Sequence, residues 1–311
     1  MNIVVIGGGT MGHGIAQQAA VHGFPVAVVD QAEAQLDLSK KLIREHMASM
    51  KELGLCTDEE NMQAFARITF TSDLEAAARQ ADFVFEAVFE DLKVKQELYA
   101  KLGDLVRQDV ILASNTSSFD IDSLVEVTTH PERVIGAHWF HPPQITPCVE
   151  LVVTKQTSQA TLDKAMEVCT KLGKFATRCT NAPAFVANRI QMALFCEACA
   201  LVDEGLATPE EIDRIVKSSF GFRIGAYGPF EIADQAGLEI YAAILDHLSV
   251  RLNKPHWKPA KIVRDHVAAK EYGLKTGKGF YDYSDKGPNV LRAERNKKFY
   301  DRLAIFNKEN F

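Results

Sequence analysis

Two side chains in the middle of the chain have the chemistry of a proton-transfer pair, the imidazole of His138 and the carboxylate of Glu150. His138 ends an apolar run at 134–138 that is typical of a buried strand, and Glu150 lies within a second such run, 147–153. Because an unpartnered carboxylate in a buried strand is costly, Glu150 needs a partner, and His138 is the natural one. An imidazole with a pKa of about 6.5 accepts protons near neutral pH, and an adjacent carboxylate fixes its tautomer. The two residues therefore predict acid–base catalysis.

A glycine-rich segment near the N-terminus has the spacing of a phosphate-binding turn. Gly7, Gly9 and Gly12 fit the pattern G-x-G-x-x-G, directly after an apolar strand and before a helical pattern that begins around Met11. Gly7 permits the tight turn, Gly9 lets a pyrophosphate approach, and Gly12 lets the helix pack close to the strand. The N–H groups at the helix start would bind the phosphates, with Thr10 and Met11 in the same turn.

The residues after the second predicted strand indicate which dinucleotide would bind. Asp30 follows the run 25–29, where a carboxylate can accept both hydrogen bonds of an adenosine ribose. The next residue is Gln31 rather than arginine, so no positive charge would offset the repulsion between Asp30 and a 2′-phosphate. We therefore expect NAD to be preferred over NADP as the cofactor. FAD, which uses the same fingerprint, is left open by this motif alone.

The elements that position these residues follow a strand–helix rhythm through residues 1–183. Apolar, β-rich runs predict strands at 2–6, 25–29, 68–71, 82–87, 109–113, 134–138, 147–153 and 174–178. Apolar residues at helical spacing predict helices at 12–22, 33–53, 91–106 and 158–172. This alternation predicts the α/β class, with a doubly wound, Rossmann-type parallel sheet that binds ligands at the carboxyl ends of its strands.

The remaining residues, 184–311, predict a second, smaller, all-helical domain. Helical patterns cover 185–204, 209–218, 229–252 and 258–269. Thr208 is expected to be the N-cap of one helix, with Pro209 at its first position and Glu211 completing a capping box.

Composition narrows the range of partners. The 311 residues carry a formal charge of -6 with a pI near 5.9, which offers neither the basic surface of a nucleic-acid binder nor a polybasic membrane patch. The chain has no apolar stretch approaching the roughly 20 residues of a membrane span and no basic leader. We expect a cytoplasmic, unprocessed protein whose partners are small molecules or copies of itself. Six scattered cysteines, Cys196 and Cys199 among them, predict reduced thiols and no metal site.

Further motifs carry a family resemblance. They are Asn115-Thr116-Ser117-Ser118, Pro183-Ala184-Phe185-Val186-Ala187-Asn188-Arg189 and Gly273-Leu274-Lys275-Thr276-Gly277-Lys278-Gly279-Phe280-Tyr281. With the glycine turn and the His138–Glu150 pair, they resemble the L-3-hydroxyacyl-CoA dehydrogenase family nearly from end to end. The resemblance implies that His138 takes the proton of a substrate hydroxyl while a hydride moves to the nicotinamide, with Glu150 orienting the imidazole. It also implies that Ser117 and Asn188 bind the reacting oxygen or its neighbour.

The resemblance further implies a set of cofactor contacts and an oligomeric state. The implied cofactor residues are Glu90, Lys95, Ser117, His141 and Lys275. For Glu90 and Lys95 the alternative is a solvated, charged helix start. A homodimer through the helical domain is implied as well, and the apolar excess in 185–204 and 229–252 fits it.

Three departures from the family pattern bear on the substrate. The usual Asn-Pro near the nicotinamide is here His141-Pro142, and His46 and Leu53 stand where CoA-dependent members tend to carry a serine and a lysine. The segment 221–229 looks more like relatives that act on free hydroxy acids, such as gulonate and carnitine dehydrogenases, and its Arg223 can pair with a carboxylate. For Arg223 the alternative is a structural ion pair.

The leading hypothesis is NAD-dependent oxidation of the 3-hydroxyl of a short-chain L-3-hydroxyacyl-CoA such as 3-hydroxybutyryl-CoA. The alternative is the same hydride transfer on a small free 3-hydroxy acid. A third hypothesis is a non-catalytic, NAD-binding structural relative, against which the complete set of Ser117, His138, Glu150 and Asn188 argues.

Overall fold

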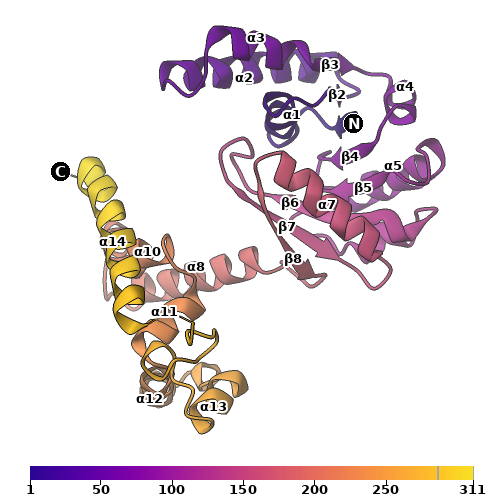
Figure 1. Cartoon of the computed structure of the whole chain (residues 1–311). Coiled ribbons are helices and arrows are strands. Elements are labelled where there is room, and N and C mark those ends of the chain that lie inside the picture. The colour runs from indigo at the N-terminus through magenta and orange to yellow at the C-terminus, as the bar shows by residue number, and fades with distance from the viewer. Residues whose placement is uncertain (286, 311) are drawn as a thin grey trace. The chain divides into compact units, whose positions relative to one another are not determined.

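The computed structural model describes residues 1–285 and 287–310 (Figure 1). The chain divides into two compact units, Met1–Leu194 and Phe195–Phe311. The division lies inside helix α8 (Ala187–Asp203), several residues after the expected start of the helical domain. Asn188, expected on the second domain, therefore belongs to the first compact unit.

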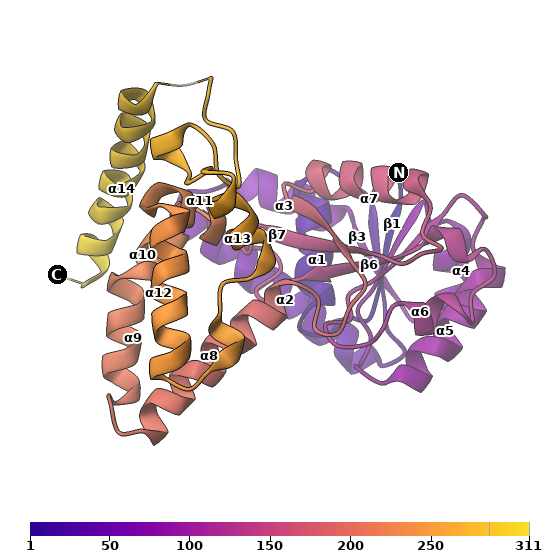
Figure 2. The same ribbon diagram turned by 90° about the horizontal axis from the view of Figure 1, so that it is seen from below.

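The first unit is built on one eight-stranded sheet with the order β3-β2-β1-β4-β5-β6-β7-β8. The strands are β1 (Ile3–Ile6), β2 (Val26–Val29), β3 (Ile68–Thr71), β4 (Phe83–Glu86), β5 (Ile111–Ser114), β6 (Val134–Trp139), β7 (Cys148–Val153) and β8 (Phe175–Thr180). All eight predicted strands are confirmed, with ends that differ by two residues at most. Figure 2 looks along this sheet, with helices on both of its faces.

The central strands β1, β4, β5 and β6 are buried on both faces, which explains why they are apolar over most of their length, whereas most residues of the edge strand β8 are exposed. One face packs on α1 (Gly12–Val21), α2 (Glu33–Glu52), α3 (Asp58–Ala66) and α7 (Gln159–Lys171). The other packs on α4 (Leu74–Arg79), α5 (Leu92–Leu105) and α6 (Asp122–Val125). Successive residues of β1 alternate between the two cores, with Ile3 and Val5 in the first and Val4 and Ile6 in the second. Helices α3, α4 and α6 were not predicted, although Thr57 and Glu60 form a capping box at the start of α3.

One strand pair departs from the parallel arrangement that the rhythm predicts. Strands β6 and β7 are antiparallel, whereas the other pairs in the described sheet are parallel. The reason is the short connection between Trp139 and Cys148, because a parallel crossover needs a dozen residues or more. This reversal sets His138 directly opposite Glu150.

The second unit is helical, as predicted. After α8 it contains α9 (Pro209–Ser218), α10 (Phe220–Ile224), α11 (Pro229–Ala236), α12 (Leu238–Arg251), α13 (Lys261–Ala268) and α14 (Pro288–Asn310). Short 3-10 turns occur at Pro255–Trp257 and Leu274–Thr276, and in the first unit at Pro131–Arg133.

The helical unit confirms one predicted helix start and divides one predicted helix into two. The capping box of Thr208 and Glu211 is confirmed at the start of α9. The single helix predicted at 229–252 is wrong, because Gly237 has a φ of 110° and separates α11 from α12. A positive φ is costly for most residues and interrupts a right-handed helix. No helix in the described part of the chain has the length and apolarity that a membrane span requires.

Candidate active site

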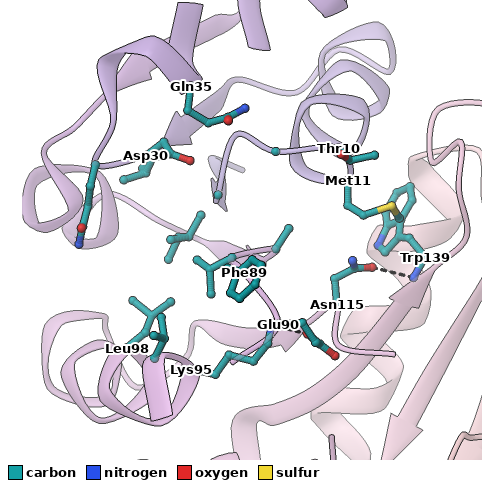
Figure 3. A pocket seen from close by; sticks show the side chains of 18 of the residues that line it. Thr10, Met11, Asp30, Gln35, Phe89, Glu90, Lys95, Leu98, Asn115 and Trp139 are labelled. Atoms are coloured by element: carbon teal, nitrogen blue, oxygen red, sulfur yellow. Dashed lines mark hydrogen bonds and ion pairs between the residues drawn. The ribbon is translucent and has the colours of Figure 1, made fainter. Parts of the chain in front are cut away.

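A cavity of about 1060 Å³ lies at the carboxyl ends of the central strands of the first unit (Figure 3). Open α/β sheets bind their ligands at this edge, and the volume is at the upper end of the roughly 300–1,000 Å³ of ligand pockets. Twelve predicted site residues line it, namely Gly7, Gly9, Thr10, Met11, Asp30, Gln31, Glu90, Lys95, Ser117, His138, His141 and Asn188. The structure thus gathers at one cavity residues that are spread over more than half of the chain.

The three glycines of the turn are required for different reasons. A Cβ at Gly7, where φ is 100°, would lie 2.4 Å from Ala87 O, and a Cβ at Gly12 would lie 1.7 Å from Gly7 O. A Cβ at Gly9, in contrast, would meet nothing within 4 Å, and Gly9 lines the cavity. The fold therefore requires glycine at positions 7 and 12. Gly9 instead leaves open space in front of the start of α1, where N–H groups attract an anion.

Asp30 holds the turn from the end of β2. Its Oδ2 accepts a hydrogen bond from the N–H of Gly8 at 2.9 Å, and its Oδ1 accepts one from the N–H of Ala32 at 3.0 Å. Gln35, which was not predicted as a site residue, also lines the cavity and donates a hydrogen bond to Gly8 O at 2.9 Å. The only signal for Gln35 in the sequence is its position on the first turns of α2, shortly after Asp30.

His138 and Glu150 form the pair that the sequence predicts. Nδ1 of His138 lies 2.8 Å from Oε2 of Glu150, and each residue is about 5% exposed. Oε1 of Glu150 accepts hydrogen bonds from the N–H groups of Ala187 at 2.8 Å and Val186 at 3.2 Å, at the start of α8. The carboxylate thus has a donor on each oxygen.

The surroundings of Glu150 keep it ionised. Burial alone would raise its pKa, but the hydrogen bonds from His138 and from the N–H of Ala187 outweigh burial and lower the pKa below its usual value of 4.5. A carboxylate that accepts from Nδ1 leaves Nε2 of His138 as the basic nitrogen of the neutral ring. The dyad can therefore accept one proton from a group in the cavity.

Amide side chains flank this dyad. Asn188, on α8, donates from Nδ2 to Ser117 O at 3.2 Å and so ties the start of that helix to the loop after β5. Asn115 accepts from the N–H of Trp139 at 2.9 Å, as Figure 3 shows, and it also lines the cavity. Asn115 was not predicted as a site residue, although it is the first residue of the motif 115–118.

An ionic cluster of two buried side chains and one partly exposed carboxylate lies at the same edge of the sheet. Nζ of Lys95 is 2.6 Å from Oε1 of Glu86 and 3.2 Å from Oε2 of Glu90. Lys95 is 1% exposed, so the alternative of a solvated helix start is wrong for it. Glu86 was not predicted as a site residue, and its only signal in the sequence is a carboxylate at the end of a buried strand.

Glu90 joins this cluster to the loop after β5. Its Oε1 accepts from the hydroxyl groups of Thr116 at 2.5 Å and Ser118 at 3.0 Å, and from the N–H of Ser117 at 3.2 Å. Burial alone would raise the pKa of Glu90, but the hydrogen bond from Thr116 and the charge of Lys95 lower it. Glu90 therefore remains a carboxylate at the wall of the cavity.

Two predicted site residues lie in the second unit. Lys275 is in the turn Leu274–Thr276 and forms an ion pair with Glu239. Arg223 is exposed on α10 and pairs with no carboxylate within residues 1–285 and 287–310, which leaves the structural ion pair without support there. The described residues contain no cluster of side chains that could hold a metal ion, and Cys196 and Cys199 are exposed free thiols.

The chain is similar in sequence and in structure to known dehydrogenases. Residues 2–182 match the model of the 3-hydroxyacyl-CoA dehydrogenase NAD-binding domain, and residues 185–283 match that of the C-terminal domain. A probable 3-hydroxybutyryl-CoA dehydrogenase of Deinococcus radiodurans is 39% identical over 91% of this chain and all of the relative. A Mesorhizobium japonicum 5-formyl-3-hydroxy-2-methylpyridine 4-carboxylate 5-dehydrogenase is 32% identical over 96% of this chain and 95% of its own length. The crystal structure of an Archaeoglobus fulgidus 3-hydroxyacyl-CoA dehydrogenase has a TM-score of 0.84 at 30% identity, covering 99% of both chains.

Proposed function

The chain belongs to the 3-hydroxyacyl-CoA dehydrogenase family and is an NAD-dependent oxidoreductase, and from this premise we propose that it converts a short-chain L-3-hydroxyacyl-CoA, such as 3-hydroxybutyryl-CoA, to the 3-ketoacyl-CoA. The observation that carries the proposal is the His138–Glu150 dyad, whose imidazole lines the cavity. A buried, ionised carboxylate behind an imidazole is the arrangement that a general base requires.

The reaction removes a proton and a hydride from the substrate. His138 accepts the hydroxyl proton at Nε2 and becomes imidazolium, while the C3–H bond breaks and its electron pair leaves as hydride. Glu150 stabilises the imidazolium through the 2.8 Å contact to Nδ1. Ser117 and Asn188 orient the reacting oxygen or its neighbour from the loop after β5 and from α8. When bound, NAD supplies the hydride acceptor.

The residues around the cavity fit NAD. Gly9 leaves room before the start of α1 for a pyrophosphate, and Asp30 and Gln31 at the end of β2 suit an adenosine ribose without a 2′-phosphate. We assign Gly7, Thr10, Met11 and Gly12 to the same turn, and Glu90, Lys95, Ser117 and His141 to the nicotinamide half of the cofactor. Lys275 is kept as a proposed cofactor contact because the family resemblance implies it.

The same hydride transfer on a free hydroxy acid is the second candidate. Its support is Arg223, an exposed guanidinium that forms no ion pair with the described residues, since such a group is suited to bidentate binding of a carboxylate. The Mesorhizobium relative is named for a substrate that carries a carboxylate. His141, in place of the family's asparagine, is a further departure that bears on this choice.

One assay separates the two substrates. Purified protein with NADH is offered acetoacetyl-CoA and free acetoacetate in parallel at matched concentrations, and the loss of NADH absorbance is followed. Faster oxidation with the thioester supports the acyl-CoA proposal, and Arg223→Met then has little effect. Preference for the free acid contradicts it, and Arg223→Met then raises the KM for the acid.

We also propose that the protein is a homodimer. Helix α8 has no buried residue, and its exposed apolar side chains include Ile190, Met192 and Phe195. Exposed apolar side chains on a helix without a buried residue are typical of a surface covered by a partner. Light scattering after size-exclusion chromatography would give twice the 34.5 kDa mass of the chain, whereas a monomeric mass would contradict the proposal.

A further inference from the structure

The cluster of Glu86, Lys95 and Glu90 contains two acidic side chains and only one basic side chain. Glu86 is fully buried, and its carboxylate accepts from Nζ of Lys95 at 2.6 Å, from the hydroxyl of Ser114 at 2.6 Å and from the N–H of Val88 at 2.9 Å. Each of these three contacts is made by a donor, so the described hydrogen bonds of Glu86 suit a carboxylate. Lys95 is the only cation that contacts this cluster among the described residues.

The cluster therefore has a formal charge of -1. Glu86 and Glu90 each contribute a negative charge, and Lys95, 1% exposed, contributes one positive charge between them. Glu86 and Lys95 are buried, so their charges are screened less by water and salt than surface charges are, whereas Glu90 is partly exposed. One pair of charges cancels, and the second carboxylate remains uncompensated.

This excess charge lies at the wall of the candidate cofactor cavity. Glu90 and Lys95 line the cavity together with Asn115, Ser117 and His138. Figure 3 shows Glu90 near Asn115, whereas Asp30 lies on another side of the same cavity. The hydrogen bonds from Thr116, Ser117 and Ser118 hold Glu90 against the loop after β5, which is close to the proposed site of proton transfer.

The nicotinamide ring differs in charge between the two forms of the cofactor. The ring carries one positive charge in NAD⁺ and none in NADH. A fixed negative charge near the ring therefore stabilises NAD⁺ and leaves NADH nearly unaffected. Such a charge favours NAD⁺ over NADH without direct contact with the cofactor.

We propose that Glu86, through the net negative charge of the Glu86–Lys95–Glu90 cluster, shifts the binding preference of the cavity toward the oxidised cofactor. Glu86 is a positioning residue in this role, because it is buried behind Lys95 and acts on the nicotinamide through charge alone. The inference rests on the proposed function, in which the nicotinamide lies at the His138 end of the cavity.

The test compares the dissociation constants of NAD⁺ and NADH for the full-length protein. In Glu86→Gln the shape is conserved and one charge is removed. We expect the ratio of the NAD⁺ to the NADH dissociation constant to rise about threefold to tenfold, because only NAD⁺ binds more weakly. Intrinsic fluorescence and isothermal titration calorimetry measure both constants without turnover.

Two variants serve as controls. Glu86→Asp disturbs the packing but keeps the charge, so its ratio should equal that of the wild type. Glu167→Gln removes an exposed carboxylate on α7 that pairs with Lys164 and Lys171, and it should also leave the ratio unchanged. If Glu86→Gln weakens NAD⁺ and NADH by the same factor, or leaves the ratio unchanged, the proposal is overturned and Glu86 has a purely structural role.

A second variant covers the case in which Glu86→Gln does not fold. Glu90→Gln removes the same charge at a partly exposed position, and its ratio should rise in the same direction. An unchanged ratio in that variant overturns the inference. A wild-type protein that binds neither form would instead refute the proposed function, so the two failures are distinguishable.

Discussion

His138 and Glu150 are register partners across the antiparallel strands β6 and β7, with Nδ1 and Oε2 2.8 Å apart. Directly opposite residues of an antiparallel pair project to the same face of the sheet. A slip of the register by one residue would move Glu150 to the other face and leave a buried carboxylate unpaired. The dyad thus depends on the reversal of chain direction between these two strands.

The imidazole of His138 is the proposed base, so its removal should affect turnover and not cofactor binding. We expect His138→Ala to lower kcat by about two to four orders of magnitude. The NADH dissociation constant should stay close to that of the wild type. Steady-state kinetics and fluorescence titration measure the two quantities. Loss of NADH binding in this variant would mean that His138 has a structural role.

Glu150 should make stability depend on pH in the acid range. Its pKa in the folded protein is lowered below 4.5, because the hydrogen bonds from His138 and Ala187 outweigh burial. The unfolded chain therefore binds more protons, and the stabilisation present above about pH 4.5 is lost as the pH falls through the folded-state pKa. Urea unfolding at several pH values should show a weaker acid dependence for Glu150→Gln. An equal acid dependence in the wild type and the variant would contradict this prediction.

Gly12 and Gly9 should respond differently to the same added methyl group. Gly12→Ala places a Cβ 1.7 Å from Gly7 O, so we expect the turn to distort and the melting temperature to fall. Gly9→Ala meets no protein atom within 4 Å, so its melting temperature should equal that of the wild type. Its NADH affinity should nevertheless drop, because the methyl group enters the proposed pyrophosphate site. Unimpaired NADH binding by Gly9→Ala would count against that site.

Asp30 should decide between NADH and NADPH. Its carboxylate would repel a 2′-phosphate, and Asp30→Asn removes the charge while it keeps an acceptor for the N–H of Gly8. We expect the affinity for NADPH relative to NADH to increase about tenfold. Titration of both cofactors measures the ratio, with Asp37→Asn as a control on the exposed side of α2. The absence of any change in the ratio would show that Asp30 lies away from the 2′-position.

Lys174 should stabilise the loop between β6 and β7. Its buried Nζ donates to Pro143 O at 2.6 Å and Thr146 O at 2.8 Å, and Lys174→Met leaves both carbonyl groups without this donor. We expect a loss of about 2–4 kcal/mol in the free energy of unfolding near neutral pH. Chemical denaturation measures it, with Lys171→Met, an exposed lysine on α7, as the control.

The same lysine predicts a pH effect in the alkaline range. Burial lowers the pKa of Lys174 from 10.5 to about 8. Between these values the unfolded chain binds more protons than the folded one, so the stability of the wild type should gain a contribution as the pH rises. Lys174→Met should lack this contribution. A stability difference between the two proteins that stays constant from about pH 8 to pH 10 would contradict the prediction.

Local patterns in the sequence were sufficient to predict the strands, the glycine turn and the acid–base pair. Short, β-rich apolar runs predicted all eight strands, and the spacing of Gly7, Gly9 and Gly12 predicted the turn before α1. The pairing of His138 with Glu150 was also predictable, because a carboxylate in an apolar strand needs a partner. The antiparallel direction of β7 was missed, although the short connection before it carries that information.

The sequence by itself determined the alternating strands and helices, the glycine turn and the acid–base pair, because each depends on interactions between residues close in the chain or on the cost of a single buried charge. Only the tertiary structure decided that Glu86 and Glu90 share the buried Lys95, that Asn188 contacts Ser117, and that Lys174 holds the loop at Pro143. These contacts depend on which strand ends and helices become neighbours, and that is set by the packing of the whole sheet. Periodicity identifies an element, but the partner of a polar side chain is chosen by the geometry of the assembled core.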